Sequence, residues 1–322
     1  MKKSVALCTY NGARFISTQL ESIFFQTEKV DEIIICDDKS KDYTVKIIKE
    51  FERNTNIPIR LIVNRKNIGC TKNFEKALSL CSGDIIFLSD QDDIWMPNKV
   101  ERITNYFTKN LDKDVVFTNA TLINEVNVAC YRDTLFDVVG MDKVNKDLVD
   151  KGFPYEAIST SSRITGATMA LRRSYLPFCI PFPNIWAVHD EVIGTIASIY
   201  NRIGYIDECL IQYRIHQTQT IGLNALFKCP PKSWAFADNL QSWHENLVHP
   251  ADETVLLNVR FIYKRYYTIR SWFSIYKILW MYYINKEYDR YGEYSQYFFH
   301  RDIYASLTRI WRKIKKLTFC DN

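Results

Sequence analysis

Short, largely apolar runs rich in β-branched residues recur along the first third of the chain. A strand buried on both faces carries apolar side chains at nearly every position, so each run is long enough for one buried strand. The five predicted strands cover residues 5–8, 32–36, 59–63, 85–88 and 115–117. Between them, apolar residues keep helical spacing at 15–24, 45–51 and 74–80. This alternation predicts an α/β fold with a mostly parallel sheet flanked by helices.

Polar residues follow four of the predicted strands, at positions 9–12, 37–40, 64–69 and 89–93. Ligands of such sheets bind at the carboxyl ends of the strands, so we expect these four segments to share one crevice. Glycine and serine are also common in turns and helix caps, and we interpret Gly12, Ser40 and Gly69 in that way. We expect Asp38 and Asp92 to be functional instead.

The densest group of carboxylates is Asp90, Asp92 and Asp93, directly after an apolar run. Carboxylates this close repel one another, and a divalent cation that bridges them to a diphosphate would remove the repulsion. The segment therefore predicts a metal site for a nucleotide-linked metabolite. The alternative is a solvated turn, because aspartate is common where strands end.

Composition narrows the class of protein. The chain has 322 residues and 47% hydrophobic content, enough for one large domain with an appendage. Its nine cysteines form no C-x-x-C pair, which is typical of reduced, mostly buried thiols in a cytosolic protein. A strand pattern begins within a few residues of the N-terminus, so we predict no signal peptide and a cytoplasmic location. The longest aromatic run, 272–284, contains Lys277 and is too short to span a bilayer.

Several short motifs in order resemble the family 2 glycosyltransferases of the GT-A fold, bacterial inverting enzymes that use nucleotide sugars. The resemblance covers roughly the first two-thirds of the chain, and an ordered set is more specific than one motif. It is carried by Thr9-Tyr10-Asn11-Gly12, Gln26-Thr27, Ile35-Cys36-Asp37-Asp38-Lys39-Ser40, Asn67-Ile68-Gly69, Ser82-Gly83-Asp84 and Asp90-Gln91-Asp92-Asp93. The segment 89–95, with 72–75 upstream, resembles the rhamnosyltransferase branch.

The resemblance implies a donor site. By it, Asp38 accepts a hydrogen bond from the imide N–H of uracil or thymine, and Asp90 lies at the ribose. Asp92 holds Mg²⁺ or Mn²⁺ against the diphosphate, in keeping with the preference of hard cations for oxygen ligands. The backbone of Cys8, Thr9 and Tyr10 lines the base pocket, and Lys72 joins the donor-binding residues. Asp93 has an alternative role as the cap of a helix that Pro97 helps to begin.

The acceptor side is expected between residues 160 and 220. Gly166 lies in a segment that resembles the acceptor-side strand of the family, where glycine leaves room for the sugar. Asp190 matches the general base, and its alternative role is to cap a helix. An acidic pair is usual here, but His189 takes the first place. The sequence leaves open whether His189 contacts the acceptor or the metal, or orients Asp190.

Two residues near the end of this segment complete the predicted site. Arg214 or His216 would neutralise the departing diphosphate, and His216 would add a metal ligand. The alternative for His216 is a solvated histidine in a polar loop.

The predicted reaction is a single in-line displacement that inverts the configuration of a sugar. The donor is a nucleoside-diphosphate sugar, taken by analogy as dTDP-rhamnose, with a UDP-sugar as the alternative. The acceptor is a hydroxyl of a glycan or lipid-linked glycan in bacterial surface polysaccharide synthesis. A rival hypothesis is an inactive nucleotide-sugar-binding or assembly protein. A P-loop or dinucleotide enzyme is disfavoured, because no glycine-rich phosphate loop follows the first strand.

The predicted catalytic domain is 1–222, with a nucleotide-sugar half of about 1–120 and an acceptor half of about 121–222. Residues 223–322 form a helical, aromatic-rich region. Apolar positions keep helical spacing over 255–283, and over 301–317 they lie opposite basic residues. The second pattern predicts peripheral membrane contact through 301–322, or packing on the catalytic domain, and vesicle flotation without 301–322 separates the two. Nucleic acid is a poor fit, because the basic residues are local and the crevice is acidic.

Overall fold

The fold comes from a computed structural model that describes residues 1–158, 163–182, 188–217 and 219, and scattered positions between 278 and 307. Two compact units divide the chain, Met1–Asp238 and Asn239–Asn322. Within the second unit, the hydroxyl of Tyr288 donates to Asp302 Oδ2 at 2.5 Å, and both side chains are buried. The predicted boundary near 222 and most of the helices predicted at 255–283 and 301–317 lie outside the described residues.

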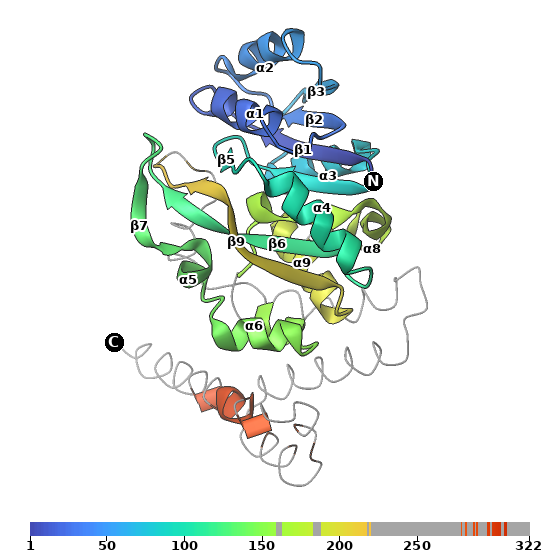
Figure 1. The fold of residues 1–322 in the computed structure, drawn as a ribbon, viewed down its shortest axis with the longest axis vertical. Helices are drawn as coiled ribbons and strands as arrows, with labels where there is room; N and C mark the ends of the chain where they lie inside the picture. The colour runs from blue at the N-terminus through green and yellow to red at the C-terminus, as the bar shows by residue number, and fades with distance from the viewer. Residues whose placement is uncertain are drawn as a thin grey trace, which may run out of the picture. The chain divides into compact units, whose positions relative to one another are not determined.

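The first unit is built on one nine-stranded sheet (Figure 1). Its first four members are all parallel: β3 pairs with β2, β2 with β1, and β1 with β4. They are β1 (Lys3–Thr9), β2 (Glu32–Asp37), β3 (Ile59–Val63) and β4 (Ile85–Ser89). These strands match the first four apolar runs, and β1, β2 and β4 are buried almost throughout. β3 is only partly buried because it lies at the edge of the sheet.

The other half of the sheet is mixed. β8 enters antiparallel between β4 and β6, β6 runs parallel to β9, and β9 pairs antiparallel with β5. β7 pairs with β6 outside the main path. The bounds are β5 (Ile94–Trp95), β6 (Val115–Ile123), β7 (Ala129–Thr134), β8 (Ala170–Arg172) and β9 (Ile203–Arg214). The α/β class is therefore confirmed, but parallel pairing is complete only from β3 to β4.

The helices follow the predicted alternation. In the first half they are α1 (Ile16–Phe24), α2 (Thr44–Arg53), α3 (Cys70–Leu80) and α4 (Lys99–Lys109). The second half has α5 (Leu135–Val139), α6 (Lys143–Asp150), α7 (Pro154–Ile158), η1 (Gly166–Thr168), η2 (Arg173–Tyr175), α8 (Leu176–Cys179) and α9 (His189–Ile199). α3 packs on β1 and β2, and it also contacts α9 from the second half.

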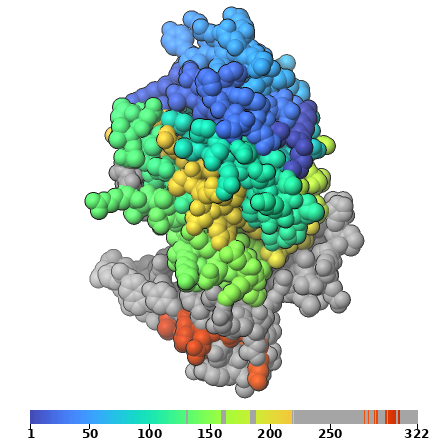
Figure 2. All heavy atoms as spheres, in the orientation of Figure 1, coloured from blue at the N-terminus to red at the C-terminus, as the bar shows by residue number. Residues whose placement is uncertain are grey.

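Late and early parts of the sequence share one surface of this unit. β9 contacts α4 and α6, and in Figure 2 its yellow atoms lie between the teal atoms of α4 and the green atoms of α6. No helix among the described residues is both long and apolar enough to cross a membrane. The six described cysteines with resolved side chains are free thiols.

Candidate functional site

The loop after β2 is held by Asp37, which is fully buried. Its Oδ2 accepts from the hydroxyls of Thr9 (2.8 Å) and Ser40 (2.5 Å), and its Oδ1 accepts from the Ser40 N–H at 2.8 Å. Lys39 takes a left-handed backbone conformation with φ of 65°, which a non-glycine residue adopts only at some cost. Asp37 therefore shapes the turn after β2. Thr9 contacts this turn twice, because its hydroxyl donates to Asp37 and its carbonyl accepts from the Asp38 N–H at 2.8 Å.

Asp38 is buried beside the loop between β3 and α3. Its Oδ1 accepts from the Ile68 N–H at 2.8 Å and from Asn64 Nδ2 at 3.0 Å, and its Oδ2 accepts from the Gly69 N–H at 2.8 Å. An ionised carboxylate offers about four acceptor positions, so three in-chain donors leave Oδ2 room for one more. The predicted contact with a base N–H stays a prediction, and it can involve only that remaining position.

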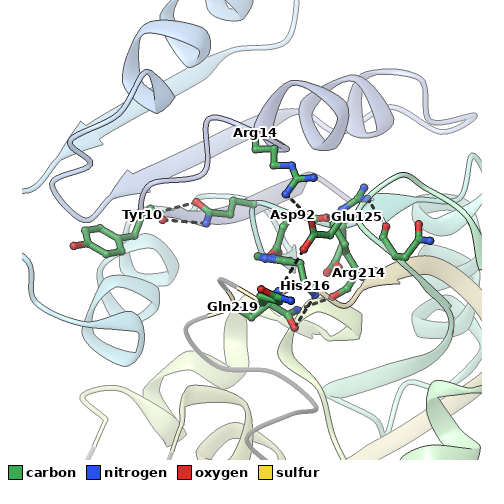
Figure 3. Close-up of polar contacts among 11 residues, drawn as sticks. Tyr10, Arg14, Asp92, Glu125, Arg214, His216 and Gln219 are labelled. Carbon is green, nitrogen blue, oxygen red and sulfur yellow. Dashed lines mark hydrogen bonds and ion pairs between the residues drawn. The ribbon is translucent and has the colours of Figure 1, made fainter. Parts of the chain in front are cut away.

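The aspartate segment, residues 89–93, is fastened to the end of β1 by the amide of Gln91. Gln91 Oε1 accepts from the Tyr10 N–H at 2.8 Å, and its Nε2 donates to the Tyr10 carbonyl at 3.0 Å (Figure 3). A Cβ on Gly12 would lie only 2.1 Å from Gln91 Oε1. A side chain at position 12 would therefore have to displace the Gln91 amide from its place beside the Tyr10 backbone.

Asp92 meets His216 across the site. His216 Nε2 lies 2.8 Å from Asp92 Oδ2, and both residues are buried (Figure 3). Phe15 supports the imidazole, with ring centroids 4.9 Å apart. His216 is therefore not a solvated loop histidine.

These two side chains fit a divalent cation that shares its ligands with a substrate. No group of three or more His, Cys, Asp or Glu side chains gathers as a metal site within the part of the chain that the structure describes. Mg²⁺ at nucleotide sites is usually held by one or two protein ligands together with phosphate oxygens. Asp92 and His216 would supply such a pair.

Arg214 binds the backbone carbonyl of Asp92. Its side chain is 1% exposed, and its Nε donates to the Asp92 carbonyl at 2.6 Å while Nη1 donates to the Asn124 carbonyl at 2.9 Å. The guanidinium also lies 4.5 Å from the Phe15 ring centroid. A donor-binding role for Arg214 stays a prediction, because the described hydrogen bonds of its guanidinium go to two backbone carbonyls of the protein.

Asp93 does not cap a helix. α4 begins at Lys99 with Asn98 before it, and Asp93 Oδ1 accepts from the Arg214 N–H at 2.9 Å. Its Oδ2 is buried with no hydrogen-bond partner among the described residues. Burial raises the pKa of Asp93, and the neighbouring carboxylates of Asp92 and Asp90 raise it further. Burial, with the charges of Asp92 and Asp190, likewise raises the pKa of Asp90 to about 8.

Asp190 lies at the start of α9. Its Oδ2 accepts from the Gly166 N–H at 2.8 Å, and its Oδ1 accepts from the Glu191 N–H at 2.8 Å. Burial raises its pKa, and these backbone hydrogen bonds oppose that rise. Asp190 is not the N-cap of α9, because that position is taken by Val188. Each of its carboxylate oxygens keeps acceptor capacity, so its backbone contacts are compatible with a role as base.

His189 packs behind Asp190 and is 3% exposed. Its ring stacks on Phe74 of α3, with centroids 3.9 Å apart, and its Nδ1 lies 4.0 Å from Cys70 Sγ. A Cβ on Gly166 would lie 2.6 Å from His189 Nε2, so glycine makes room for this imidazole. Burial lowers the pKa of His189 to about 3, which keeps the ring neutral.

Cys70, at the first position of α3, identifies where the carboxylates converge. Burial raises the pKa of its thiol most, and the charges of Asp90, Asp190, Asp38 and Asp92 each raise it further. The Cys70 thiol is therefore within electrostatic range of carboxylates from the loops after β2 and β4 and from α9. Cys70 was not predicted from the sequence as a site residue, although it directly follows the motif that ends at Gly69.

Lys72 and Cys8, two of the residues predicted to bind the sugar donor, have no described hydrogen bond to the aspartate segment. Lys72 Nζ donates to Glu75 Oε2 at 2.9 Å and to the Phe182 carbonyl at 3.2 Å, so its donor-binding role stays a prediction. Cys8 is buried at the end of β1, where burial raises its pKa most and the charges of Asp90 and Asp38 contribute. Cys8 thus lies near the carboxylates expected to bind the nucleoside.

Comparison with known proteins gives one family match. The model of "Glycosyl transferase family 2" matches residues 4–176. The dTDP-rhamnosyl transferase RfbG of Shigella flexneri is 30% identical over 261 residues, 75% of this chain and 82% of RfbG. The UDP-Glc:alpha-D-GlcNAc-diphosphoundecaprenol beta-1,3-glucosyltransferase WfgD of Escherichia coli is 29% identical over 67% of this chain and 78% of WfgD. The putative glycosyltransferase EpsE of Bacillus subtilis is 33% identical, but the match spans 39% of this chain and 46% of EpsE.

Solved structures share the fold at low sequence identity. TarS 1-349 of S. aureus in complex with UDP-GlcNAc has a TM-score of 0.58 at 16% identity, covering 96% of this chain and 89% of TarS 1-349. The mannosyltransferase PcManGT of Pyrobaculum calidifontis, in complex with GDP-Man and Mn²⁺, has a TM-score of 0.56 at 15% identity. It covers 97% of this chain and 88% of that one. The expected GT-A fold is confirmed.

Proposed function

The chain belongs to glycosyl transferase family 2, and on that basis we propose that it moves a sugar from a nucleoside-diphosphate sugar to an acceptor hydroxyl. One observation carries the proposal: the Cys70 thiol lies within electrostatic range of four carboxylates, Asp38, Asp90 and Asp92 from the loops after β2 and β4 and Asp190 from α9. This proximity supports a donor site and a general base that serve the same reaction.

The donor side has groups for a nucleotide and for its charge. Asp38 keeps one acceptor position for a base N–H, and Asp90 lies close enough to Asp92 and Asp190 to interact electrostatically with both. Asp92 and His216 would hold Mg²⁺ or Mn²⁺. When bound, the cation would stabilise negative charge on the leaving diphosphate.

Asp190 is the proposed general base. The Gly166 and Glu191 N–H groups fix its carboxylate, and burial raises its pKa, which makes it a stronger base than an exposed aspartate. Asp190 takes the proton of the acceptor hydroxyl as the oxygen attacks the anomeric carbon. The bond to the diphosphate breaks on the opposite face, so the configuration inverts.

The finer assignment of substrates rests on the relatives. Similarity to RfbG supports dTDP-rhamnose as the donor, and similarity to WfgD supports a UDP-sugar as the alternative. The name of WfgD includes a lipid diphosphate acceptor, which supports a glycan or lipid-linked glycan acceptor here. Such an acceptor would fit a role in bacterial surface polysaccharide synthesis on the cytoplasmic side of the membrane.

An Asp190→Asn variant tests the proposal. Release of nucleoside diphosphate would be followed with dTDP-rhamnose and UDP-glucose in the presence of Mn²⁺, alongside binding of dTDP and UDP. Because asparagine cannot take a proton, we expect kcat to fall roughly 10²- to 10⁴-fold. Nucleotide affinity should stay within about twofold, since Asp190 acts on the acceptor side.

Asp112→Asn is the matched control, because that carboxylate is exposed, with 72% of its side-chain area open to solvent. Wild-type turnover by Asp190→Asn with intact nucleotide binding would remove Asp190 from the mechanism. Nucleotide binding without turnover of any sugar donor by the wild-type chain would favour an inactive binding protein.

A further inference from the structure

One buried charged residue has no part in the reaction proposed above. Lys99, the first residue of α4, has no exposed surface. A lysine is rarely fully buried unless its ammonium is paired, because removing the charge from water is costly. The groups that surround Lys99 therefore indicate what its burial achieves.

The contacts of Lys99 reach two parts of the site. Its Nζ donates to the Ala167 carbonyl at 2.9 Å and lies 4.0 Å from the Trp95 ring centroid. Burial lowers the pKa of Lys99 to about 7, while the charges of Asp93 and Asp90 oppose that change. Lys99 thus contacts the turn η1 directly and lies within electrostatic range of the aspartate segment.

The turn η1 also anchors the base. Its first residue, Gly166, donates its N–H to Asp190 Oδ2 at 2.8 Å, and Ala167 is the next residue along the chain. A displacement of the Ala167 carbonyl would therefore move the peptide group that fixes Asp190. A lysine amine donates in both its charged and its neutral form, so the bond to Ala167 does not depend on its protonation.

We propose that Lys99 is a positioning residue for Asp190, which it holds at a fixed place relative to the aspartate segment through the Ala167 carbonyl and the Gly166 N–H. This inference rests on the proposed function, in which Asp190 is the base. Lys99 contacts neither substrate in this scheme. Through its hydrogen bond to the Ala167 carbonyl, Lys99 connects the start of α4 to the turn η1, which holds the base.

Two substitutions separate the hydrogen bond from the charge. Lys99→Met removes both the hydrogen bond and the charge and keeps a side chain of similar length. Lys99→Gln keeps an N–H donor but has no charge. Lys109→Met is the matched control, because Lys109 is an exposed lysine at the end of the same helix. The measurements are release of nucleoside diphosphate from dTDP-rhamnose and UDP-glucose with Mn²⁺, the affinity for dTDP and UDP, and hydrogen exchange of the amides of 166–168.

For Lys99→Met we expect kcat to fall roughly 10²-fold, because a displacement of about 1 Å at a reacting group can have that effect. Nucleotide affinity should stay within about twofold, and the Gly166 amide should exchange faster. Lys99→Gln should retain more of the wild-type kcat than Lys99→Met, and Lys109→Met should match the wild type. If Lys99→Met does not fold, the same comparison of kcat, affinity and exchange is made on Lys99→Gln.

A fall in nucleotide affinity with unchanged kcat and exchange would overturn the inference, because Lys99 would then act only as a counter-charge of the donor site. Unchanged kcat and exchange in both variants would overturn it as well. Failure of the proposed function gives a different result, since the wild type itself would then turn over no donor. Whether or not the wild type turns over a donor, faster hydrogen exchange of the Gly166 amide in the variants would show that Lys99 stabilises the turn η1.

Discussion

His189 is held neutral by its surroundings, because burial lowers its pKa to about 3 in the folded protein. An unfolded histidine titrates near pH 6.5, so between pH 6.5 and 3 the unfolded chain binds a proton that the folded chain does not. The free energy of unfolding therefore falls as the pH drops below 6.5, and above that pH this contribution to stability is complete. Acid should therefore lower the free energy of unfolding through the protonation of His189 in the unfolded chain.

We predict that His189→Leu, which has similar volume and no titrating group, loses less stability than the wild type between pH 7.5 and pH 5. The difference should be up to about 2 kcal/mol, from about 1.4 kcal/mol for each pH unit below 6.5. Urea unfolding at the two pH values measures it. His300→Asn is the control, because His300 is exposed. Equal acid sensitivity of His189→Leu and the wild type would contradict a neutral, buried imidazole.

At the scale of elements, the loop between β1 and α1 is fitted to the aspartate segment. The Gly12 N–H donates to Thr44 Oγ1 at 2.8 Å, while the Gln91 amide occupies the space that a Cβ on Gly12 would need. The same amide bonds twice to the Tyr10 backbone. A side chain at position 12 would therefore displace the link between the two loops.

Gly12→Ala should lower the free energy of unfolding by about 1–3 kcal/mol, the usual cost of overpacking. Gln91→Ala removes the atoms that a new Cβ would meet, so the double variant should be more stable than the sum of the single effects predicts. Denaturant unfolding of the four proteins gives the coupling energy. Strict additivity would mean that the close approach of Gly12 and Gln91 has no energetic consequence.

At the scale of the first unit, its two halves together make the predicted metal pair. Asp92 follows β4 and His216 follows β9, and the backbone of Arg214 connects them through Asp93. Ligands that bind only the folded state raise its stability by mass action. A cation shared between protein and diphosphate should therefore stabilise the protein most when both ligands are present.

Mn²⁺ together with dTDP or UDP should raise the melting temperature more than the sum of their separate effects. At about 100 times the dissociation constant the gain is about 2.7 kcal/mol. Asp92→Ala and His216→Ala should lose the joint effect, and the Asp112→Asn protein should keep it, as measured by thermal unfolding. An undiminished joint effect in Asp92→Ala would remove this residue from the metal site.

Local patterns were sufficient for the strands β1 to β4 and for the helices α1 to α3. Strand and helix periodicity depends on neighbouring residues, so it can be read without knowledge of the fold. Asp38 and Asp92 likewise follow predicted strands, so their place at one edge of the sheet could be predicted from local pattern, while their roles stay predictions.

Partners distant in the sequence could be identified only from the tertiary structure. The antiparallel insertion of β8, the pairing of β9 with β6, and the direction of the Arg214 guanidinium toward the Asp92 carbonyl depend on segments far apart in the chain. The same holds for Lys99, which resembles any surface lysine in a helical pattern until Ala167 is packed against it. Periodicity records which side of an element is buried, but packing of the whole unit decides which groups meet there.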